Sequence, residues 1–278
     1  MSDLKKHLER QSMPELPEVE TIRRQLVGTV SGAVVTGLVV RRVSCYVGGE
    51  LKELEIIKEV SRVGKYLYIH FNSGRGFAIH LKMTGRLVVN VDDYDTLPHT
   101  RVVISLGDGR RVYYWDARTF GYVKYVDDIK GEQERQKVRL GPDPWEISEE
   151  KFFDLIKKYK RPVKNLLLDQ ALISGIGNIY ANDGLWESGI DPRRTSSNLS
   201  KIESKKLLHA LRMVMERGLI TGGASDNSYV NALGQKGSYQ DEFRVYKRTG
   251  KPCLRCGKKL ERIVVGGRGT WVCKECQT

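Results

Sequence analysis

Four cysteines close to the end of the chain have the spacing of a metal site. Cys253 and Cys256 form one Cys-x-x-Cys pair, and after sixteen residues Cys273 and Cys276 form another. Four thiolates in two such pairs close a tetrahedron around Zn²⁺ without leaving a position for a substrate, so we expect one structural zinc ion. The segment between the pairs, GKKLERIVVGGRGTW, predicts a β-hairpin whose glycine-rich turn carries Arg268. On its own, Arg268 is typical of a solvated turn.

A glycine-rich turn in the middle of the chain is a second candidate binding site. SGIGNIY at residues 174–180 places Gly175 and Gly177 directly before a predicted helix. Backbone N–H groups at a helix start bind phosphate, and Asn178 adds a side-chain donor. Glycines also mark turns that bind nothing, so an ordinary turn is the alternative interpretation.

The run SMPELPEVE at residues 12–20 is acidic and rich in proline, although the chain as a whole is basic. Taken singly, Glu15 and Glu18 are typical of the exposed start of a helix. The twelve residues before Met13 contain no apolar run of the kind found in secretory signals, and we expect them to have no function.

The charge distribution points to a polyanionic partner. Lys and Arg number 47 against 34 Asp and Glu, which gives a net charge of +13. From Arg244 to Thr278, ten basic residues stand against two acidic ones. Such clustering favours nucleic acid over a diffusely basic surface. No apolar run is long enough to span a bilayer, and apart from Cys45, an expected small core residue, the cysteines are paired for metal, so we expect a cytoplasmic location.

Two kinds of hydrophobic pattern divide the chain. Residues 30–126 are strand-like: KYLYIHF alternates apolar and polar positions, and NSGRG at 72–76 and GDGR at 107–110 are turn signals, which predicts an antiparallel sandwich or barrel. A polar, proline-containing segment follows and is expected to be a linker. Beyond it, Ser148 is expected to start one helix, and Ser200 with Glu203 at capping-box spacing starts another that ends at Gly218.

Several motifs occur together in one order along the chain: PELPEVE, KYL, HLKMTGRL, DARTFG, LGPDP, GIGNIYANDGLW and the four cysteines. In these motifs the chain resembles the formamidopyrimidine-DNA glycosylase family. The resemblance implies an α+β multidomain fold: an N-terminal antiparallel β-sandwich, a helix–two-turn–helix middle domain and a C-terminal zinc-finger hairpin. The expected limits are a non-native or processed extension at 1–13, the catalytic sandwich at 14–126, a linker at 127–147, the helical DNA-binding domain at 148–243 with a lesion-covering loop at 220–240, and the zinc finger at 244–278.

The resemblance also implies an activity, namely excision of oxidised purines such as 8-oxoguanine and formamidopyrimidines from duplex DNA, followed by cleavage of the abasic strand. Pro14 would be the nucleophile, because an N-terminal secondary amine is far less basic than a lysine side chain and gives a cationic iminium on attack at a sugar C1′. Glu15 would be the general acid and base, and Glu18 a second essential carboxylate. Lys65 would act in β-elimination, and Arg268 in δ-elimination.

Further residues match positions that hold DNA in the family. Met83, Arg118 and Phe120 would fill the gap left by the extruded nucleotide, with Arg118 facing the orphaned base. Without the resemblance, Met83 and Phe120 would be interpreted as core residues of strands. The residues expected to bind backbone phosphates are His99, Lys160, Lys164, Asn178 and Arg268. The chain departs from the family at Thr119, where arginine is frequent, and at Asp183, where glutamate is usual. A monomer at the bacterial nucleoid is expected.

Two alternatives remain at this point. An endonuclease VIII-like enzyme, specific for oxidised pyrimidines, would share Pro14, Glu15 and the zinc module, although Leu16 and the MTG and RTF wedge motifs fit the purine enzyme better. A DNA-binding protein without catalysis would result if residues 1–12 stayed attached, because Pro14 would then carry an amide nitrogen.

Overall fold

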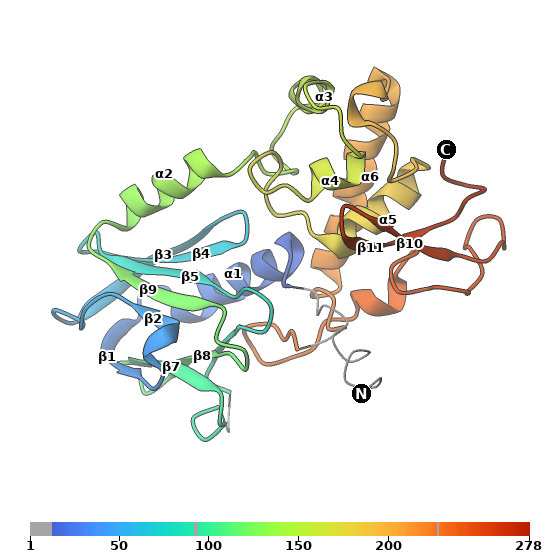
Figure 1. Ribbon diagram of the computed structural model, residues 1–278. Coiled ribbons are helices and arrows are strands. Elements are labelled where there is room, and N and C mark those ends of the chain that lie inside the picture. The colour runs from blue at the N-terminus through green and yellow to red at the C-terminus, as the bar shows by residue number, and fades with distance from the viewer. Residues whose placement is uncertain (1–12, 92–93, 227) are drawn as a thin grey trace. The chain divides into compact units, whose positions relative to one another are not determined.

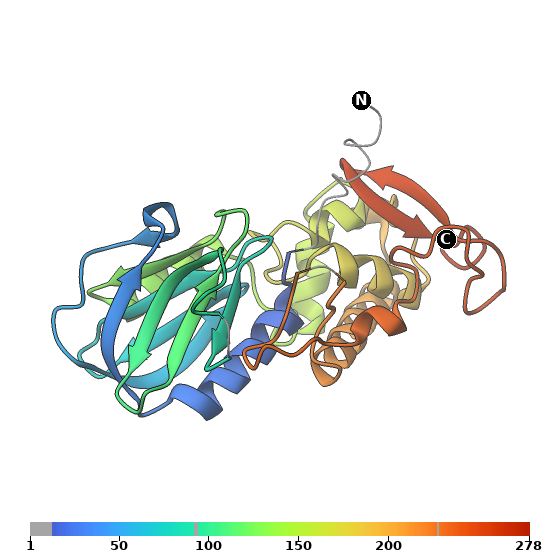
Figure 2. The same ribbon diagram turned by 90° about the horizontal axis from the view of Figure 1, so that it is seen from below.

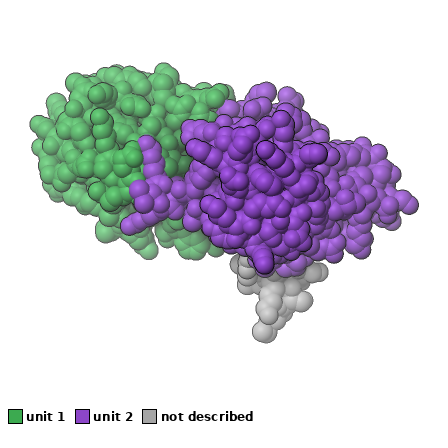
Figure 3. Space-filling view, turned by 90° about the horizontal axis from the view of Figure 1, so that it is seen from above, with its two compact units in different colours: residues 1–136, 222–237 green, residues 137–221, 238–278 purple. Residues whose placement is uncertain are grey.

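The computed structural model describes residues 13–91, 94–226 and 228–278, so the predicted extension lies outside the described residues except for Met13. The chain forms two compact units (Figure 3). The first, here called the sheet unit, runs to Gln136 and also includes Gly222–Gly237. The second, the helical unit, comprises Lys137–Thr221 and Ser238–Thr278.

In its described residues the sheet unit contains helix α1, nine strands and most of helix α2 (Figure 1). In chain order its described elements are α1 (Leu16–Val30), β1 (Val34–Val40), the 3₁₀ turn η2 (Val43–Cys45), β2 (Tyr46–Val47), β3 (Glu55–Val63), β4 (Tyr66–Phe71), β5 (Gly76–His80), β6 (Arg86–Val89), β7 (Thr100–Leu106), β8 (Arg111–Trp115) and β9 (Tyr122–Val126). Helix α2 (Ile129–Arg139) follows and contains the boundary between the units.

The helical unit contains three short helices, the 20-residue helix α6 and one two-stranded hairpin. Its described elements are α3 (Glu149–Lys157), α4 (Val163–Leu167), α5 (Asn178–Ser188), η3 (Ser196–Asn198), α6 (Lys201–Ile220), η4 (Tyr239–Glu242), β10 (Glu261–Val265) and β11 (Arg268–Val272).

The nine strands follow the order β2-β9-β5-β4-β3-β1-β7-β8-β6. Two residue pairs, Val34–Ile56 and Val35–Glu55, join β1 to β3. The strands on both sides of this short junction contribute to one hydrophobic core, so the two halves of the sheet face each other as the predicted sandwich does (Figure 2). The pair β2–β9 is parallel, which corrects the expectation of a wholly antiparallel sheet.

Alternation along β4 sets which side chains enter this core. Leu67, Ile69 and Phe71 belong to it, whereas Tyr68 packs on the other face with Ile129 of α2. This confirms the alternation predicted for KYLYIHF. Helix α1 contributes Val19, Ile22, Leu26 and Val30 to the same core, at helical spacing.

The segment 127–147, expected to be a linker, holds helix α2. Its pattern did not predict a helix because Ile129 is its one buried residue among those described. Charge supports it instead: Glu132 lies in the first turn and binds Lys124 and Arg135, while Arg139 lies in the last turn.

Two helix starts in the helical unit are as predicted. The Ser148 hydroxyl caps α3 by accepting from the Lys151 amide, and Ser200 with Glu203 forms a capping box at the start of α6. The predicted end of α6 at Gly218 is wrong, because the helix continues to Ile220. A Cβ at position 218 would lie 2.2 Å from the Tyr180 hydroxyl, so this glycine provides room for a ring of α5 inside the helix.

The two turns between α4 and α5 are fixed by one side chain. Gln170 accepts from the Gly175 amide at 2.9 Å and donates to the Ile176 carbonyl at 2.8 Å. Gly175 has φ of +88°, a conformation that glycine adopts at no steric cost. The chain is thereby turned so that α5 begins at Asn178, as the glycine motif predicted.

Asp183 connects α5 to the segment that leads to the hairpin. This fully buried carboxylate accepts from the amides of Arg244, Val245 and Tyr246 at 3.0–3.2 Å, and from the Tyr239 hydroxyl at 3.1 Å. Burial raises the pKa of Asp183, while these donors act in the opposite direction. The resemblance led us to expect a glutamate here, and the shorter aspartate is held by main-chain donors that reach it.

In the part of the chain that the structure describes, no helix has both the length and the apolar composition needed to cross a membrane.

Gly218→Ala should destabilise the protein by about 1–3 kcal/mol, because overpacking against Tyr180 outweighs the gain in helix propensity. Gly28→Ala in α1 is the matched control: a Cβ there meets nothing within 4 Å, so we expect up to about 1 kcal/mol of stabilisation. Urea unfolding followed by circular dichroism measures both, and equal effects of the two substitutions would contradict the packing argument.

Candidate functional site

The predicted nucleophile and its neighbouring carboxylates lie at the start of α1. Glu15 is the N-cap residue and is 2% exposed, and Glu18, in the first turn, is 1% exposed. Together they form a capping box in which the Glu15 amide donates to Glu18 Oε2 at 2.9 Å. Pro14 therefore directly precedes a helix start that contains two buried carboxyl groups. The interpretation of Glu15 and Glu18 as exposed helix-start residues is wrong.

Glu18 also binds the loop 222–237. Its second oxygen, Oε1, accepts from the Ala224 amide at 2.8 Å, and Tyr229 donates to the Glu18 carbonyl at 3.4 Å. Further along the loop, the Ala232 amide donates to the Gln25 side chain, and the Ala232 carbonyl accepts from the Val89 amide. These contacts explain why the loop belongs to the sheet unit, whereas the expected limits placed it in the helical domain.

The orientation of α1 depends on Glu20. This carboxylate binds Arg23 and Arg24 of the same helix and, at 2.8 Å, Arg62 of β3. Burial raises the pKa of Glu20, but the hydrogen bonds from the three arginines outweigh it and lower the pKa to about 2. The helix that carries the predicted nucleophile is thus attached to the sheet by an ionic contact as well as by its apolar face.

Lys65 lies in the tight turn between β3 and β4 and is 5% exposed. His80 at the end of β5 is also buried, and its Nδ1 accepts from the Lys82 amide at 3.0 Å. Burial lowers the pKa of His80 to about 3, and the charges of Lys82 and Lys65 act in the same direction. His80 is therefore neutral near neutral pH and keeps its Nδ1 available as an acceptor.

The three predicted wedge residues are located on two turns of the sheet unit. Met83 is half-buried in the turn between β5 and β6. Arg118 and Phe120 are exposed in the turn between β8 and β9, where the guanidinium carbon of Arg118 lies 4.6 Å from the centre of the Phe120 ring. A half-exposed phenylalanine at the tip of a turn contradicts its interpretation as a core strand residue, and it is suited to insertion between bases.

His99 has the donor that its predicted phosphate contact needs. Arg101 lies 3.1 Å from His99 Nδ1, and because a guanidinium can only donate, Nδ1 is the acceptor and the ring proton resides on Nε2. The imidazole packs edge-on against Trp115 at 5.4 Å between centres, which fixes the plane in which this N–H points.

In the helical unit, two of the predicted DNA-binding residues donate to the same main-chain carbonyl. Gly269 O accepts from Lys164 Nζ at 2.8 Å and from Asn178 Nδ2 at 3.2 Å. Gly269 directly follows Arg268, which is exposed at the start of β11 beside Gly266 and Gly267, both with positive φ. The predicted hairpin is thus confirmed, and its turn is held against α4 and α5.

The two lysines expected to bind phosphate differ sharply. Lys164 is fully buried, and its ammonium also donates to Thr270 Oγ1 at 2.7 Å, so it braces the hairpin in this structure. Lys160 is exposed after the end of α3. A phosphate contact remains a prediction for both, and exposure favours Lys160.

The four cysteines form a site that fits zinc. Their sulfur atoms all lie within 4.8 Å of one another, with Cys253–Cys276 at 3.9 Å and Cys256–Cys273 at 3.4 Å. Zn–S bonds of about 2.3 Å at tetrahedral angles require sulfurs about 3.8 Å apart. Trp186 of α5 donates its indole N–H to Cys253 at 3.4 Å, so the ligand set is oriented by the helical unit.

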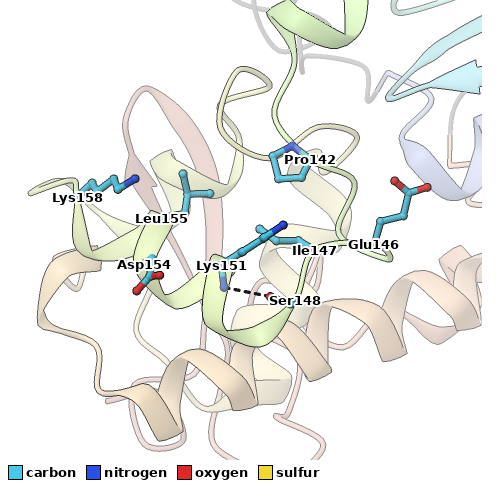
Figure 4. A pocket seen from close by; sticks show the side chains of 8 residues that line it. All are labelled: Pro142, Glu146, Ile147, Ser148, Lys151, Asp154, Leu155 and Lys158. Atoms are coloured by element: carbon cyan, nitrogen blue, oxygen red, sulfur yellow. Dashed lines mark hydrogen bonds between the residues drawn. The ribbon is translucent and has the colours of Figure 1, made fainter.

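A pocket of about 550 Å³ in the helical unit has no relation to these residues (Figure 4). It lies along α3 and is lined by Pro142, Glu146, Ile147, Ser148, Lys151, Asp154, Leu155 and Lys158. None of the predicted site residues lines it, and its mixed apolar and charged wall indicates no particular ligand.

Sequence reasoning missed residues that support the site rather than touch DNA. Asn182 accepts from the Trp271 amide of β11 at 2.9 Å, and Asp116 accepts from the Arg118 amide at 3.1 Å. The sequence held a clue to Asp116, because an Asp side chain in a turn commonly accepts from the amide two residues later and so forms an Asx turn. It held none to Asn182, since its partner is 89 residues away.

The sheet unit, the helix–two-turn–helix and the four-thiolate hairpin together define a zinc-finger protein that binds DNA. Three family models match the chain in this order: the Formamidopyrimidine-DNA glycosylase N-terminal domain at residues 13–123, the Formamidopyrimidine-DNA glycosylase H2TH domain at 140–229, and the Zinc finger found in FPG and IleRS at 250–278. The chain belongs to the formamidopyrimidine-DNA glycosylase family, which confirms the predicted family, fold class and zinc ion.

Similar proteins agree along nearly the whole length. The Formamidopyrimidine-DNA glycosylase of Desulfitobacterium hafniense is 37% identical over 95% of this chain and 100% of its own. The MutM (Fpg) structure from Thermus thermophilus is 38% identical with a TM-score of 0.85, covering 95% of this chain and 98% of that one. The Lactococcus lactis Fpg in complex with DNA containing an abasic site is 31% identical with a TM-score of 0.86, covering 95% and 99%.

Acid should remove the stabilisation that Glu20 supplies. Its folded pKa of about 2 lies below the ordinary 4.5, so the contribution is complete above pH 4.5 and is lost as the pH falls towards 2. At pH 7 we expect Glu20→Gln to lower the free energy of unfolding by about 2–3 kcal/mol. The difference from the wild type, measured by urea unfolding, should shrink below pH 4.5; a constant difference would contradict the assignment.

Metal analysis should find one zinc per chain. Removing it with a chelator should increase hydrogen exchange in residues 261–272 and weaken DNA binding, because the hairpin loses its ligand-held end. The exchange of β4 and β5 should not change. Cys273→Ser should abolish zinc retention, whereas Cys45→Ala, at a fully buried apolar position, should keep one equivalent. Full protection of the hairpin after metal removal would contradict a structural site.

Proposed function

We propose that this protein excises oxidised purines, 8-oxoguanine and formamidopyrimidines, from duplex DNA and then cleaves the abasic strand, with the Pro14 nitrogen as nucleophile. The buried Glu15–Glu18 pair directly after Pro14 is the observation that carries the proposal. Membership of the family supports it, as do relatives crystallised with DNA that contains an abasic site or Fapy-dG.

The first step is attack of the neutral Pro14 amine on C1′ of the damaged nucleotide. The bond from C1′ to the purine breaks, and the base leaves with its bonding pair and takes up the proton that the attacking proline nitrogen loses. Glu15 then protonates O4′ as the C1′–O4′ bond breaks, which opens the sugar ring and leaves a C1′=N⁺ iminium on the proline. Glu18 accepts from the Glu15 amide and so holds the main chain between the nucleophile and the acid.

The iminium drives the strand cleavage. It acidifies C2′, and loss of a C2′ proton with departure of the 3′ phosphate oxygen completes β-elimination; Lys65 stabilises the leaving phosphate. Loss of a C4′ proton then releases the 5′ phosphate, assisted by Arg268. Water finally hydrolyses the iminium, which releases the sugar remnant as an aldehyde and restores the Pro14 amine.

The remaining residues bind and distort the duplex. His99, Lys160, Asn178 and Arg268 contact phosphates, while the buried Lys164 holds the hairpin that carries Arg268. Met83, Arg118 and Phe120 occupy the gap in the stack. The clustered positive charge makes affinity salt-dependent. Loop 222–237, with its backbone held by Glu18, covers the extruded base.

The active form begins at Pro14 in this proposal, because an amide bond to Met13 would remove the nucleophilic lone pair. The match to the N-terminal family model, which begins at residue 13, supports this start. We propose a monomer in the cytoplasm, associated with the nucleoid.

Borohydride trapping tests the nucleophile. A protein that starts at Pro14 should form a covalent adduct with a duplex containing 8-oxoguanine, because hydride reduces the iminium to a stable amine. Pro14→Gly should still trap, through a primary amine, but more slowly. No adduct from the protein that starts at Pro14 would overturn the proposal.

Two comparisons separate the alternatives. Faster excision of thymine glycol than of 8-oxoguanine would favour the endonuclease VIII-like enzyme. The chain with residues 1–12 attached should bind DNA without forming an adduct; an adduct on that chain would exclude Pro14 as the nucleophile.

A further inference from the structure

Asp116, directly after β8, carries a fully buried carboxylate that is held by four donors. Oδ1 accepts from the Thr84 hydroxyl and, at 3.1 Å, from the Arg118 amide. Oδ2 accepts from the Gly121 amide at 2.9 Å and from the Tyr114 hydroxyl at 3.2 Å. A charge this deeply buried persists only with such hydrogen bonds, so its four partners are fixed with it.

Three of these four donors come from the two turns that carry the wedge residues, and the fourth, the Tyr114 hydroxyl, comes from β8. Thr84 follows Met83 in the first turn, while the Arg118 and Gly121 amides bracket Phe120 in the second. The Thr84 hydroxyl also accepts from the Arg118 amide at 3.2 Å, so the two turns are joined to each other through one carboxyl and one hydroxyl group.

Both turns contain backbone in an unfavourable conformation immediately before the wedge side chain. Lys82 has φ of +51° before Met83, and Thr119 has φ of +56° before Phe120. For a β-branched residue such as threonine this region is a true outlier, and it persists only where the surroundings enforce it. Asp116 provides that enforcement at Thr119, because it binds the amides on both sides of the strained residue.

The main chain of Asp116 extends the network to a third residue expected to face DNA. Its amide donates to the His99 carbonyl at 2.9 Å, and its carbonyl accepts from Arg101 at 2.8 Å. Arg101 in turn donates to the His99 ring. The positions of Met83, Phe120 and His99 therefore depend on one residue that is itself inaccessible to DNA.

We propose that Asp116 is a positioning residue for base extrusion: through Thr84 and the amides of Arg118 and Gly121 it holds both turns in the strained form that presents the wedge. This inference rests on the void-filling role proposed above for Met83, Arg118 and Phe120. When the carboxylate or its link to Thr84 is lost, the turns relax and the wedge no longer enters the stack.

The experiment compares Thr84→Val with Thr84→Ser, in the protein that starts at Pro14. Valine removes the hydroxyl while nearly conserving volume, and serine keeps it. The first readout is the fluorescence of 2-aminopurine placed beside a stable abasic analogue in duplex DNA at saturating protein, which rises when the wedge unstacks the step. The second is single-turnover excision of 8-oxoguanine.

We expect Thr84→Val to lose most of the fluorescence change and to excise about tenfold more slowly, because a small displacement of positioning groups has large effects on rate. Thr84→Ser should retain both. Asp116→Asn should behave like Thr84→Val or worse. The side-chain NH₂ of asparagine would replace one of the two carboxylate oxygens, and it cannot accept from the donors that this oxygen binds. Asp108→Asn is the matched control: Asp108 also accepts an amide two residues on, from Arg110, but lies in the β7–β8 turn without wedge residues, so we expect wild-type behaviour.

Wild-type fluorescence and excision in folded Thr84→Val, with both lost in Phe120→Ala, would overturn the inference and leave the proposed wedge in place. Unchanged fluorescence and excision in Phe120→Ala itself would overturn the wedge role and the inference with it. Should Asp116→Asn fail to fold, the valine and serine pair decides the question, because thermal unfolding can verify that both are native.

Discussion

Buried carboxylates that accept main-chain amides hold the irregular segments of this protein in place. Glu18 binds the amides of Glu15 and Ala224, Asp116 those of Arg118 and Gly121, and Asp183 those of Arg244, Val245 and Tyr246. A buried charge is tolerated only when it is hydrogen-bonded, and a buried amide only when it has an acceptor. A carboxylate that accepts from main-chain amides meets both requirements at once. Loops without a ladder of their own thereby acquire one defined geometry.

The helical unit applies the same principle with the opposite charge. Lys164 is buried because two oxygen acceptors of the hairpin receive its ammonium, and Asn178 adds a second donor to the same Gly269 carbonyl. The other end of the hairpin carries two of the four cysteines, whose thiolates hold zinc. The turn with Arg268 is therefore supported from its base by metal and from its side by side chains, which leaves the guanidinium exposed on a rigid support.

Features with a local cause could be predicted from the sequence. The alternation of β4, the caps at Ser148 and Ser200, the glycine turn before α5 and the cysteine spacing each depend on neighbouring residues, and each is found in the structure. Features with a distant cause could not. Gly218 was predicted to end α6, but the helix continues because the Tyr180 ring occupies the space of a side chain at this position. Helix α2 has no apolar face, and its Glu132 is instead paired with Lys124 of β9 and with Arg135 of α2 itself.

The candidate site follows the same division. Motifs predicted Pro14, Glu15 and the wedge residues through the family resemblance, whereas hydrophobicity alone would have placed Met83 and Phe120 in the core. The supporting residues were not predicted, because a carboxylate such as Asp116 acquires its importance from Thr84, which is 32 residues away in the sequence. The role of such a residue depends on its burial and on its hydrogen-bond partners, and both are properties of the folded chain.

The loop 222–237 has one further property. Its two ends meet, since the Ser238 amide donates to the Thr221 carbonyl at 2.9 Å, and its body is attached elsewhere through Glu18 and Gln25. Closing a loop costs little more as its length grows. Insertions and deletions within it therefore leave both α6 and the path to the zinc hairpin undisturbed.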